Sequence, residues 1–377
     1  MNIAFLSHLD MNLFLFRLPV MEALVARGHN VYAICPTGSY SFKFQSYGIK
    51  HITYEIERES LNPFKEKRFI DNIYQAISPL KLDIIHTFTA KPNIYGTFAA
   101  KRAKVPVILN LVEGLGSFYI EDTFKNKIMR LIIERLYKSA FNISNCAVFV
   151  NSDDPKYMID KGIIPEKKLK IIKSVGVDTN FFSKESVCNV EELKSSLGLD
   201  NKLIILMVAR AIWHKGVREF YEAAKSFDND KVVFVLVGDI DKGNPSSADE
   251  KFLKKGSVRW LGHRDDIREL TAMADIYVLP SYREGVPRTL LEAASMGKPI
   301  VTTDTVGCRE VVDDTINGFL VPVQDSEALV SKIEKLIKDK SLREKMGKAS
   351  RKKALSEFDI QKIVMQYLDL YGKYYDL

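Results

Sequence analysis

Long apolar runs are missing from this sequence of 377 residues. The longest ones, 203–209 and 232–237, are far shorter than the roughly 20 residues of a membrane-spanning helix, and their composition is typical of buried strands. The amino-terminal segment has no basic lead and no small-residue cleavage site, so we expect a strand there and not a signal peptide. These absences predict a cytoplasmic protein without a transmembrane segment.

Cysteine and histidine are scarce, with four and six copies. The cysteines are widely separated, without a CxxC pair or a histidine-rich segment, and stand at Cys35, Cys146, Cys188 and Cys308. This spacing argues against a zinc site and against a disulfide framework, so we expect free thiols and no bound metal. Short internal repeats are also absent, which excludes a solenoid.

The balance of charge is mildly basic. Lysine and arginine exceed aspartate and glutamate by 55 to 48, a formal net charge of +7. This excess favours anionic partners but does not distinguish phosphates, anionic lipids and nucleic acids. The length fits two domains of ordinary size, with a cleft between them as the first expectation.

Strand-like and helical segments alternate through both halves of the chain. In the first half we expect strands at 3–7, 31–35, 84–86, 107–111, 147–150 and 169–173, and helices at 16–27 and 94–103. In the second half we expect strands at 203–209, 232–237, 258–261, 276–279 and 300–303, and helices at 217–226, 267–274 and 288–296. This alternation predicts an α/β protein with two Rossmann-like domains, each built on a parallel sheet.

A polar stretch at 181–186 fits a linker between the domains. We therefore place the first domain at 1–180 and the second at 181–357. The last helix, 358–377, carries three tyrosines at helical spacing. It either packs on the first domain and completes it, or closes only the second.

Two cations follow the strand 203–209. Arg210 comes directly after it, and Lys215 stands just before the helix that starts near Val217. Ligands bind at the carboxyl ends of strands in open α/β sheets, and a helix N-terminus adds free N–H groups. A diphosphate fits such a place, although a solvated surface pair would have the same pattern.

Two acidic residues mark the segment 279–292. Glu284 lies on a glycine-containing turn, and Glu292 lies within the helix that follows. A single acid near a helix N-terminus is explained by the helix dipole. The second acid is not, and the two carboxylates can contact different parts of one elongated ligand.

These motifs resemble those of the retaining GT-B glycosyltransferases of family 4, and the resemblance covers both halves of the chain. The matching residues are Arg210, Lys215, Gly216, Glu284 and Glu292, where the two glutamates form an E-x7-E motif, together with the segments 274–281 and 291–293. The resemblance implies the GT-B fold, in which two Rossmann-like domains face each other across a cleft. It implies that the first domain binds the acceptor and the second binds a nucleotide sugar.

The family pattern also implies roles for individual residues. Arg210 and Lys215 would neutralise the nucleotide diphosphate, since cations at the leaving phosphate stabilise the transition state. Glu284 would contact hydroxyl groups of the donor sugar, and Glu292 would accept hydrogen bonds from both ribose hydroxyls. The backbone around the turn would help to hold the phosphate or the sugar, through Gly285, Val286, Arg288, Thr289 and Leu290.

Asp239 and Asp241 form a DxD pattern, which in other proteins binds a metal. Because Arg210 and Lys215 already supply positive charge, we interpret this segment as a polar loop. We expect neither a metal nor another cofactor, with the nucleotide sugar as a substrate.

The acceptor side is less well defined. Glu113 lies in a glycine-rich loop after the strand 107–111, at a position where many members of the family have histidine. Glu113 either positions or partly deprotonates the acceptor hydroxyl, or it orders the loop. His8 and His86 follow strands in the same way, and either line the cleft or have a structural role.

A basic amphipathic helix is expected at 124–141, with apolar residues such as Ile128 and Leu131 among Lys and Arg residues such as Arg130 and Lys138. Such a helix can lie on anionic lipid headgroups. The alternative is a core helix with a solvated cationic face.

A closer resemblance rests on the segments 5–8, 60–64, 111–119 and 210–217. They are similar to the enzymes that add the first GalNAc to polyprenyl-diphosphate-linked diacetylbacillosamine in Campylobacter-type N-linked protein glycosylation. This resemblance implies UDP-GalNAc as donor, an α1,3 linkage formed with retention, and an undecaprenyl-diphosphate-linked acceptor. It also implies a peripheral protein at the cytoplasmic face of the inner membrane, with helix 124–141 as the contact and no nucleic acid as partner.

Two other functions remain open from the sequence. The same motifs would serve a transferase of another UDP-sugar to a lipid-linked glycan in capsule or lipopolysaccharide assembly. A binding protein that kept the fold but lost catalysis is a further alternative. The joint presence of Arg210, Lys215, Glu284 and Glu292 argues against it.

Overall fold

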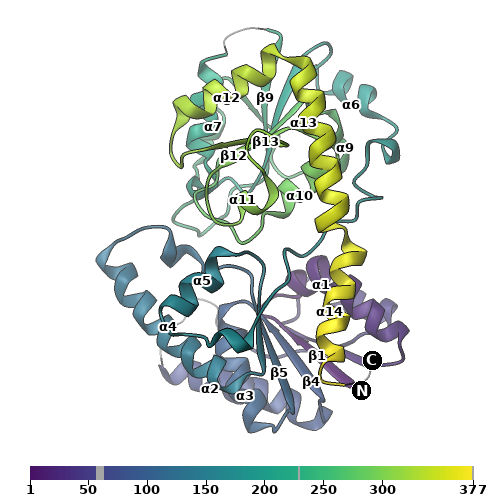
Figure 1. Cartoon of the computed structure of the whole chain (residues 1–377), viewed down its shortest axis with the longest axis vertical. Coiled ribbons are helices and arrows are strands. Elements are labelled where there is room, and N and C mark those ends of the chain that lie inside the picture. The colour runs from purple at the N-terminus through teal and green to yellow at the C-terminus, as the bar shows by residue number, and fades with distance from the viewer. Residues whose placement is uncertain (57–62, 228–229, 376–377) are drawn as a thin grey trace. The chain divides into compact units, whose positions relative to one another are not determined.

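The computed structural model describes residues 1–56, 63–227 and 230–375 (Figure 1). The chain divides into two compact units: unit 1 comprises Met1–Val175 and Gln361–Leu377, and unit 2 comprises Gly176–Ile360. Residues 60–62 of the segment 60–64, which contributes to the closer resemblance, lie outside the described residues.

Unit 1 is built on a parallel sheet of seven strands in the order β3-β2-β1-β4-β5-β6-β7. The strands are β1 (Asn2–Leu6), β2 (Asn30–Ile34), β3 (Lys50–Ile52), β4 (Ile84–Phe88), β5 (Val107–Val112), β6 (Cys146–Phe149) and β7 (Leu169–Ile171). The central strands β4 and β5 are buried along their whole length, as expected where helices cover both faces of a sheet. The strand order reverses between β1 and β4, and such a reversal is where α/β proteins bind ligands.

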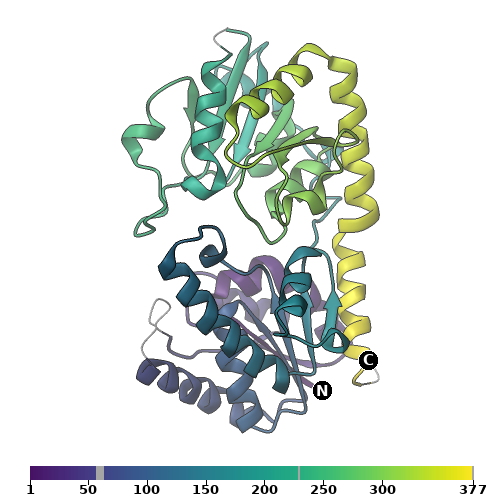
Figure 2. The same cartoon turned by 60° about the vertical axis from the view of Figure 1, so that its left-hand side comes forward.

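The helices of unit 1 flank this sheet (Figure 2). They are α1 (Asp10–Ala26), α2 (Pro63–Ile77), α3 (Thr97–Arg102), α4 (Phe124–Ile143), α5 (Asp153–Asp160) and α14 (Ile360–Gly372). The helix expected from residue 16 begins six residues earlier, at Asp10, whose carboxylate accepts hydrogen bonds from Tyr40 N and Ser41 Oγ. The expected helix 94–103 is divided into a π-helical turn at Pro92–Gly96 and the shorter α3.

Unit 2 has a parallel sheet of six strands in the order β10-β9-β8-β11-β12-β13. The strands are β8 (Leu203–Val208), β9 (Val232–Val237), β10 (Val258–Trp260), β11 (Ile276–Leu279), β12 (Ile300–Thr303) and β13 (Gly318–Val321). The helices are α6 (Val190–Ser196), α7 (Val217–Lys225), α8 (Glu250–Leu253), α9 (Ile267–Met273), α10 (Arg288–Ser295), α11 (Cys308–Val311), α12 (Ser326–Lys338) and α13 (Lys340–Lys353). The order reverses between β8 and β11.

The polar stretch 181–186 is not a free linker. Phe182 is buried in the core of unit 2, and its carbonyl oxygen accepts hydrogen bonds from Ser295 Oγ and Arg351 Nη1. One aromatic side chain in a polar stretch is enough to anchor it, because burying a Phe contributes about 1.5–3 kcal/mol.

The four cysteines are free thiols, as expected, and all except Cys188 are buried. Among the described residues, no helix combines the length and the apolar character needed to cross a bilayer.

Helix α14 packs on unit 1, as Figures 1 and 2 show. Its Tyr367 and Tyr371 side chains are buried, and Tyr371 Oη lies 2.8 Å from Nδ1 of His86 on β4. Burial, together with the charge of Arg17, holds the pKa of His86 well below its usual value, so the ring is neutral. This buried polar contact joins the last helix to the centre of the first sheet.

We predict that Tyr371→Phe lowers the free energy of unfolding by about 1–3 kcal/mol, because it leaves a buried ring nitrogen of His86 without a partner. Tyr374→Phe is the matched control, since no hydrogen bond of the Tyr374 hydroxyl is found among the described residues. Urea denaturation followed by circular dichroism measures both variants. Equal losses in the two would contradict the assigned role of the His86 contact.

Candidate functional site

The loops after β8 and β11 meet where the strand order of unit 2 reverses. Lys215, at the end of the first loop, places its Nζ 2.5 Å from Oε1 of Glu284 on the second. Ser281, at the carboxyl end of β11, donates its hydroxyl to the same Oε1 at 2.7 Å. The structure therefore brings together two of the expected site residues, and it adds Ser281, which the sequence analysis missed.

The Lys215–Glu284 pair has unused hydrogen-bonding capacity. The Lys215 and Glu284 side chains are 22% and 11% exposed. Within the described residues, Glu284 Oε2 has no partner, and Lys215 has no acceptor other than Glu284 Oε1. An ammonium group has three N–H donors and a carboxylate has two oxygens, so the pair can bind a ligand with both polarities.

Two glycines allow the loops after β8 and β12 to pass close to the loop after β11. Gly216 has φ 78°, and a Cβ at this position would lie 2.1 Å from Pro280 O. Gly307 has φ 80°, and its Cβ would lie 2.2 Å from Gly285 O. Gly216 is one of the residues that match the family 4 motifs. Nothing in the local sequence indicates the role of Gly307, because the loop that it contacts, at Gly285, is distant along the chain.

Glu292 lies on the first turns of α10, next to Arg288. Arg288 Nε donates to Glu292 Oε1 at 2.9 Å, and the Glu292 side chain is only 10% exposed. Burial raises the pKa of the Glu292 carboxyl, and the Arg288 guanidinium opposes this shift. The site thus contains a second carboxylate held by a cation.

The backbone around the start of α10 corresponds only in part to the expected ligand-binding segment. The segment Gly285–Thr289 forms the turn and the first helical positions, where N–H groups lack intrahelical acceptors. Leu290 differs, because its N–H donates to Pro287 O at 3.1 Å and its side chain is fully buried. The N–H of Leu290 is thus already engaged within the chain, and its expected contribution to ligand binding stays a prediction.

Arg210 is separate from the Lys215–Glu284 pair. Its side chain is 63% exposed, and its Nη1 lies 2.6 Å from Oδ2 of Asp241. Asp241 also accepts a hydrogen bond from Asn244 Nδ2, and Asp239 accepts one from the N–H of Ile240. The DxD segment is thus a hydrogen-bonded loop, and among the described residues no group of three or more metal-binding side chains is found.

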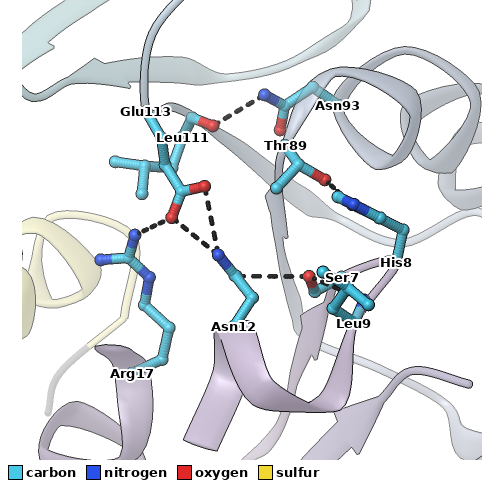
Figure 3. A network of polar contacts seen from close by, with 9 residues as sticks. All are labelled: Ser7, His8, Leu9, Asn12, Arg17, Thr89, Asn93, Leu111 and Glu113. Carbon is cyan, nitrogen blue, oxygen red and sulfur yellow. Dashed lines mark hydrogen bonds and ion pairs between the residues drawn. The ribbon is translucent and has the colours of Figure 1, made fainter. Parts of the chain in front are cut away.

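The edge of the unit 1 sheet carries a second polar network (Figure 3). Glu113, directly after β5, places Oε1 2.5 Å from Arg17 Nη2, and Asn12 Nδ2 donates to both Glu113 oxygens at 3.0 and 3.2 Å. Arg17 is 1% exposed, with its guanidinium carbon 4.8 Å from the centre of the Phe88 ring. Asn12 and Arg17 both come from α1, and the sequence analysis missed them because they lie about a hundred residues from Glu113.

The two histidines have different environments. His8 follows β1, and its Nδ1 lies 2.5 Å from Oγ1 of Thr89, which follows β4 (Figure 3). His86 lies inside β4 and is fully buried against α14, so its structural interpretation is correct. His8, Thr89 and Glu113 thus lie at the carboxyl ends of three neighbouring strands.

The two halves of helix α4 differ in how far their apolar side chains are buried. Its carboxyl half packs into unit 1 through Tyr137 and Phe141, as a core helix does. Its amino half instead exposes large apolar side chains at helical spacing: Phe124 (80%), Ile128 (45%), Leu131 (48%) and Ile132 (45%). The amino half of α4 is thus less buried than a core helix, and its contact with a membrane stays a prediction.

Comparisons with known proteins identify both halves of the chain. Residues 2–146 match the family model described as glycosyl transferase 4-like, and residues 189–353 match glycosyl transferases group 1. The chain is 41% identical to the N,N'-diacetylbacillosaminyl-diphospho-undecaprenol alpha-1,3-N-acetylgalactosaminyltransferase of Campylobacter jejuni, over 99% of both chains. It is 31% identical to the UDP-Gal:alpha-D-GlcNAc-diphosphoundecaprenol alpha-1,3-galactosyltransferase of Escherichia coli, over 83% of this chain and 81% of that enzyme.

Solved structures have the same fold. Anabaena Alr3699/HepE in complex with UDP superposes with a TM-score of 0.81 over 99% of this chain and all of that one, at 20% identity. Sucrose-phosphate synthase from Thermosynechococcus elongatus gives a TM-score of 0.84 over 99% of this chain and 98% of that one, at 19% identity. At these identities the similarity concerns the fold alone, which is GT-B.

We predict that Gly216→Ala lowers the free energy of unfolding by more than about 2 kcal/mol, because the added Cβ collides with Pro280 O and the left-handed backbone becomes strained. Gly256→Ala is the control, since Gly256 has φ 98° and nothing within 4 Å of its Cβ position. This control should lose about 1 kcal/mol from backbone strain alone. Chemical denaturation of both variants gives the comparison, and a similar loss in each would refute the close approach of the two loops.

Proposed function

Because the chain belongs to the GT-B glycosyltransferases of family 4, we propose that it transfers GalNAc from UDP-GalNAc to undecaprenyl-diphosphate-linked N,N'-diacetylbacillosamine. The product would be an α1,3 linkage formed with retention, in bacterial protein N-glycosylation. The observation that carries this proposal is the 41% identity over 99% of both chains to the Campylobacter jejuni transferase.

The Lys215–Glu284 pair is proposed as the centre of the donor site. Cleavage of the bond between the sugar and the phosphate places negative charge on the β-phosphate, and the remaining N–H groups of Lys215 would stabilise it. A donor fixed in this way contributes about 2–4 kcal/mol to the transition state. Glu284 Oε2 would accept hydrogen bonds from hydroxyl groups of the GalNAc.

Arg210 is proposed as the second cation for the diphosphate. Its exposed pair with Asp241 is worth only about 0–1 kcal/mol, so the guanidinium can leave Asp241 for a phosphate at little cost. With two cations in these roles and Asp239 and Asp241 engaged in their own loop, the proposed transfer requires no metal.

Glu292 and the start of α10 are proposed to bind the nucleotide. The carboxylate of Glu292, whose Oε1 accepts a hydrogen bond from Arg288 Nε, would accept hydrogen bonds from both ribose hydroxyls. The turn at Gly285 and Val286, with the first N–H groups of α10 at Arg288 and Thr289, would bind the phosphate or the sugar, since helix N-termini favour anions.

Glu113 is proposed to orient the acceptor hydroxyl. Arg17 and Asn12 hold its carboxylate in one position, and the Glu113 side chain remains 27% exposed. The hydrogen bonds from Arg17 and Asn12 to Glu113 also order the loop. Ordering of the loop and orientation of the acceptor are therefore compatible roles for Glu113. Glu113→Ala would leave the buried Arg17 without its ion partner, and Glu113→Gln is therefore the variant that tests the acceptor role.

Helix α4 is proposed as a peripheral contact with the cytoplasmic face of the inner membrane. Its amino half combines the exposed apolar stripe with exposed Lys125 and Lys127, and Lys138 is exposed further along the helix. Each basic residue near an anionic surface contributes about 1 kcal/mol, and the apolar side chains would enter the lipid. A lipid-linked acceptor would then be presented to unit 1.

A second candidate function uses the same proposed donor site with other substrates. The Escherichia coli relative is named as a galactosyltransferase that uses UDP-Gal and a diphosphoundecaprenol-linked sugar. This observation favours, as the alternative, transfer of another UDP-sugar to another lipid-linked glycan, as in capsule or lipopolysaccharide assembly.

The test of the proposed function is a panel of UDP-sugars with undecaprenyl-diphosphate-linked diacetylbacillosamine, analysed by mass spectrometry of the lipid-linked product. We predict product with UDP-GalNAc and at least about a hundredfold less with UDP-Gal or UDP-GlcNAc, because a missing or misplaced polar group leaves site groups unpaired. Excess EDTA should leave the rate unchanged. Product only with another donor would support the second candidate, and a strict metal requirement would restore Asp239 and Asp241 as ligands.

The same assay tests substitutions of the residues proposed to bind the donor and the acceptor. Lys215→Ala and Glu284→Gln should fold and lose about 100-fold or more in turnover. Glu113→Gln should lower kcat without changing the affinity for UDP-GalNAc. Lys225→Ala is the control for a surface lysine, since the ion pair that it forms among the described residues is with Glu222 on its own helix. Normal turnover of Lys215→Ala or Glu284→Gln would disprove the proposed donor site.

We predict that the double variant Ile128→Ser/Leu131→Ser binds vesicles of phosphatidylglycerol and phosphatidylethanolamine about tenfold or more weakly, because it removes two apolar side chains from the stripe. Stability should not change, since both side chains are about half exposed. Ile316→Ser in unit 2 is the control, because Ile316 is 60% exposed and lies far from α4 in the chain. Sedimentation with vesicles provides the measurement. Equal vesicle binding by the double variant and the unchanged protein would show that the apolar stripe of α4 does not contact lipid.

A further inference from the structure

A cavity of about 710 Å³ lies within unit 2 at the edge of the sheet opposite to the proposed donor site. Ala274 and Asp275, directly before β11, and Lys298 and Pro299, directly before β12, contribute to its lining. The loops of the donor site leave the carboxyl ends of β8 and β11. Because β11 has four residues, the two edges are about 13 Å apart.

The lining of this cavity is strongly basic. Seven lysine or arginine side chains and four carboxylates line it, an excess of three positive charges when Lys298 is protonated. Within the described residues, five of the basic side chains form no ion pair with a carboxylate: Lys184, Lys298, Arg343, Lys348 and Arg351. Positive charges gathered without carboxylate partners repel one another, and an anion would relieve this repulsion.

Lys298 is the most buried of these cations. It is 4% exposed, and its Nζ donates to Ala272 O and Ala274 O, each at 2.6 Å, at the carboxyl end of α9. Burial, followed by the charge of Lys184, lowers the pKa of Lys298 to about 7. Backbone carbonyls thus hold the amine in place, but they do not neutralise it.

Helix α13 presents a row of charges to the cavity. Arg343, Lys348 and Arg351 lie on the face of α13 that lines it. Gly347 lies on the same face, and its Cβ would lie 2.3 Å from Gly297 O, so α13 approaches the end of α10 closely. Arg351 Nη1 is anchored by Thr179 O and Ser295 O, which fixes its guanidinium at the cavity wall.

We propose that this cavity binds a small phosphorylated anion with at least two negative charges. Nη1 of Arg343 and Nη1 of Arg351 donate to backbone carbonyls, so their Nε and Nη2 groups, for which no acceptor is found among the described residues, are the donors for phosphate oxygens. Lys184 and Lys348 add point charges at the exposed rim. The excess charge of the lining matches a diphosphate better than a single carboxylate. Helix α10 connects the two edges, since its last residue Ser295 lines the cavity and its first residue Arg288 holds Glu292.

The experiment uses inorganic pyrophosphate as the probe and measures its binding by isothermal titration calorimetry. The full chain is titrated in saturating UDP, which occupies the proposed donor site, and succinate serves as the anion without phosphate. Lys184→Glu/Lys348→Glu reverses two rim charges. Lys345→Glu/Lys352→Glu, on positions of α13 that do not line the cavity, is the matched control for net charge.

We expect one pyrophosphate site in saturating UDP, with a Kd that rises about tenfold or more in Lys184→Glu/Lys348→Glu and changes less than about twofold in the control. No binding, equal losses in both double variants, or equal affinity for succinate would overturn the proposal. The single variant Lys348→Gln gives the same comparison if the double variant does not fold. The comparison between variants does not depend on the proposed transferase activity, whereas the UDP condition does, so failure of one can be told from failure of the other.

Discussion

The ion pair between Lys215 and Glu284 joins the two loops that leave the sheet of unit 2 where its strand order reverses. In a parallel sheet every strand ends at the same edge, and at the reversal the two adjacent connections turn to opposite faces. The contact joins the two loops beside the close approach of Gly216 to Pro280 O. The same pair supplies the charges proposed to bind the donor, so one interaction serves both the local structure and the proposed chemistry.

Unit 1 also has an ion pair at the carboxyl edge of its sheet, but the cation of this pair is more deeply buried. Arg17 holds Glu113 at the end of β5, but Arg17 is almost completely buried, whereas Lys215 is partly exposed. A buried guanidinium stacked on Phe88 can position Glu113 but cannot reach a ligand in solution. Lys215 can do both. This difference agrees with a carboxylate that orients an acceptor in unit 1 and a cation that stabilises a leaving phosphate in unit 2.

Charges elsewhere in the chain are distributed unevenly. The exposed apolar stripe of α4 lies among lysines in unit 1, and the basic cavity of unit 2 gathers cations without carboxylate partners. The exposed apolar groups of α4 are neutral or unfavourable for folding, whereas Lys298 and Arg351 of the cavity also bind backbone carbonyls of unit 2. The first feature is the proposed contact with lipid, and the second is the proposed site for a phosphorylated anion.

The sequence alone determined the α/β class, the GT-B family and the positions of most strands, because buried parallel strands are continuous apolar runs such as 203–209 and because the E-x7-E motif is local. It could not determine which residues hold the motif in place. Asp241, Asn12 and Arg17 contact partners that are distant along the chain, and a hydrogen bond between distant residues leaves no periodic pattern. Burial in the tertiary structure also decided the role of Phe182, which anchors an apparently polar linker, and the exposure of half of α4. These properties depend on which surfaces meet, and only the folded chain specifies that.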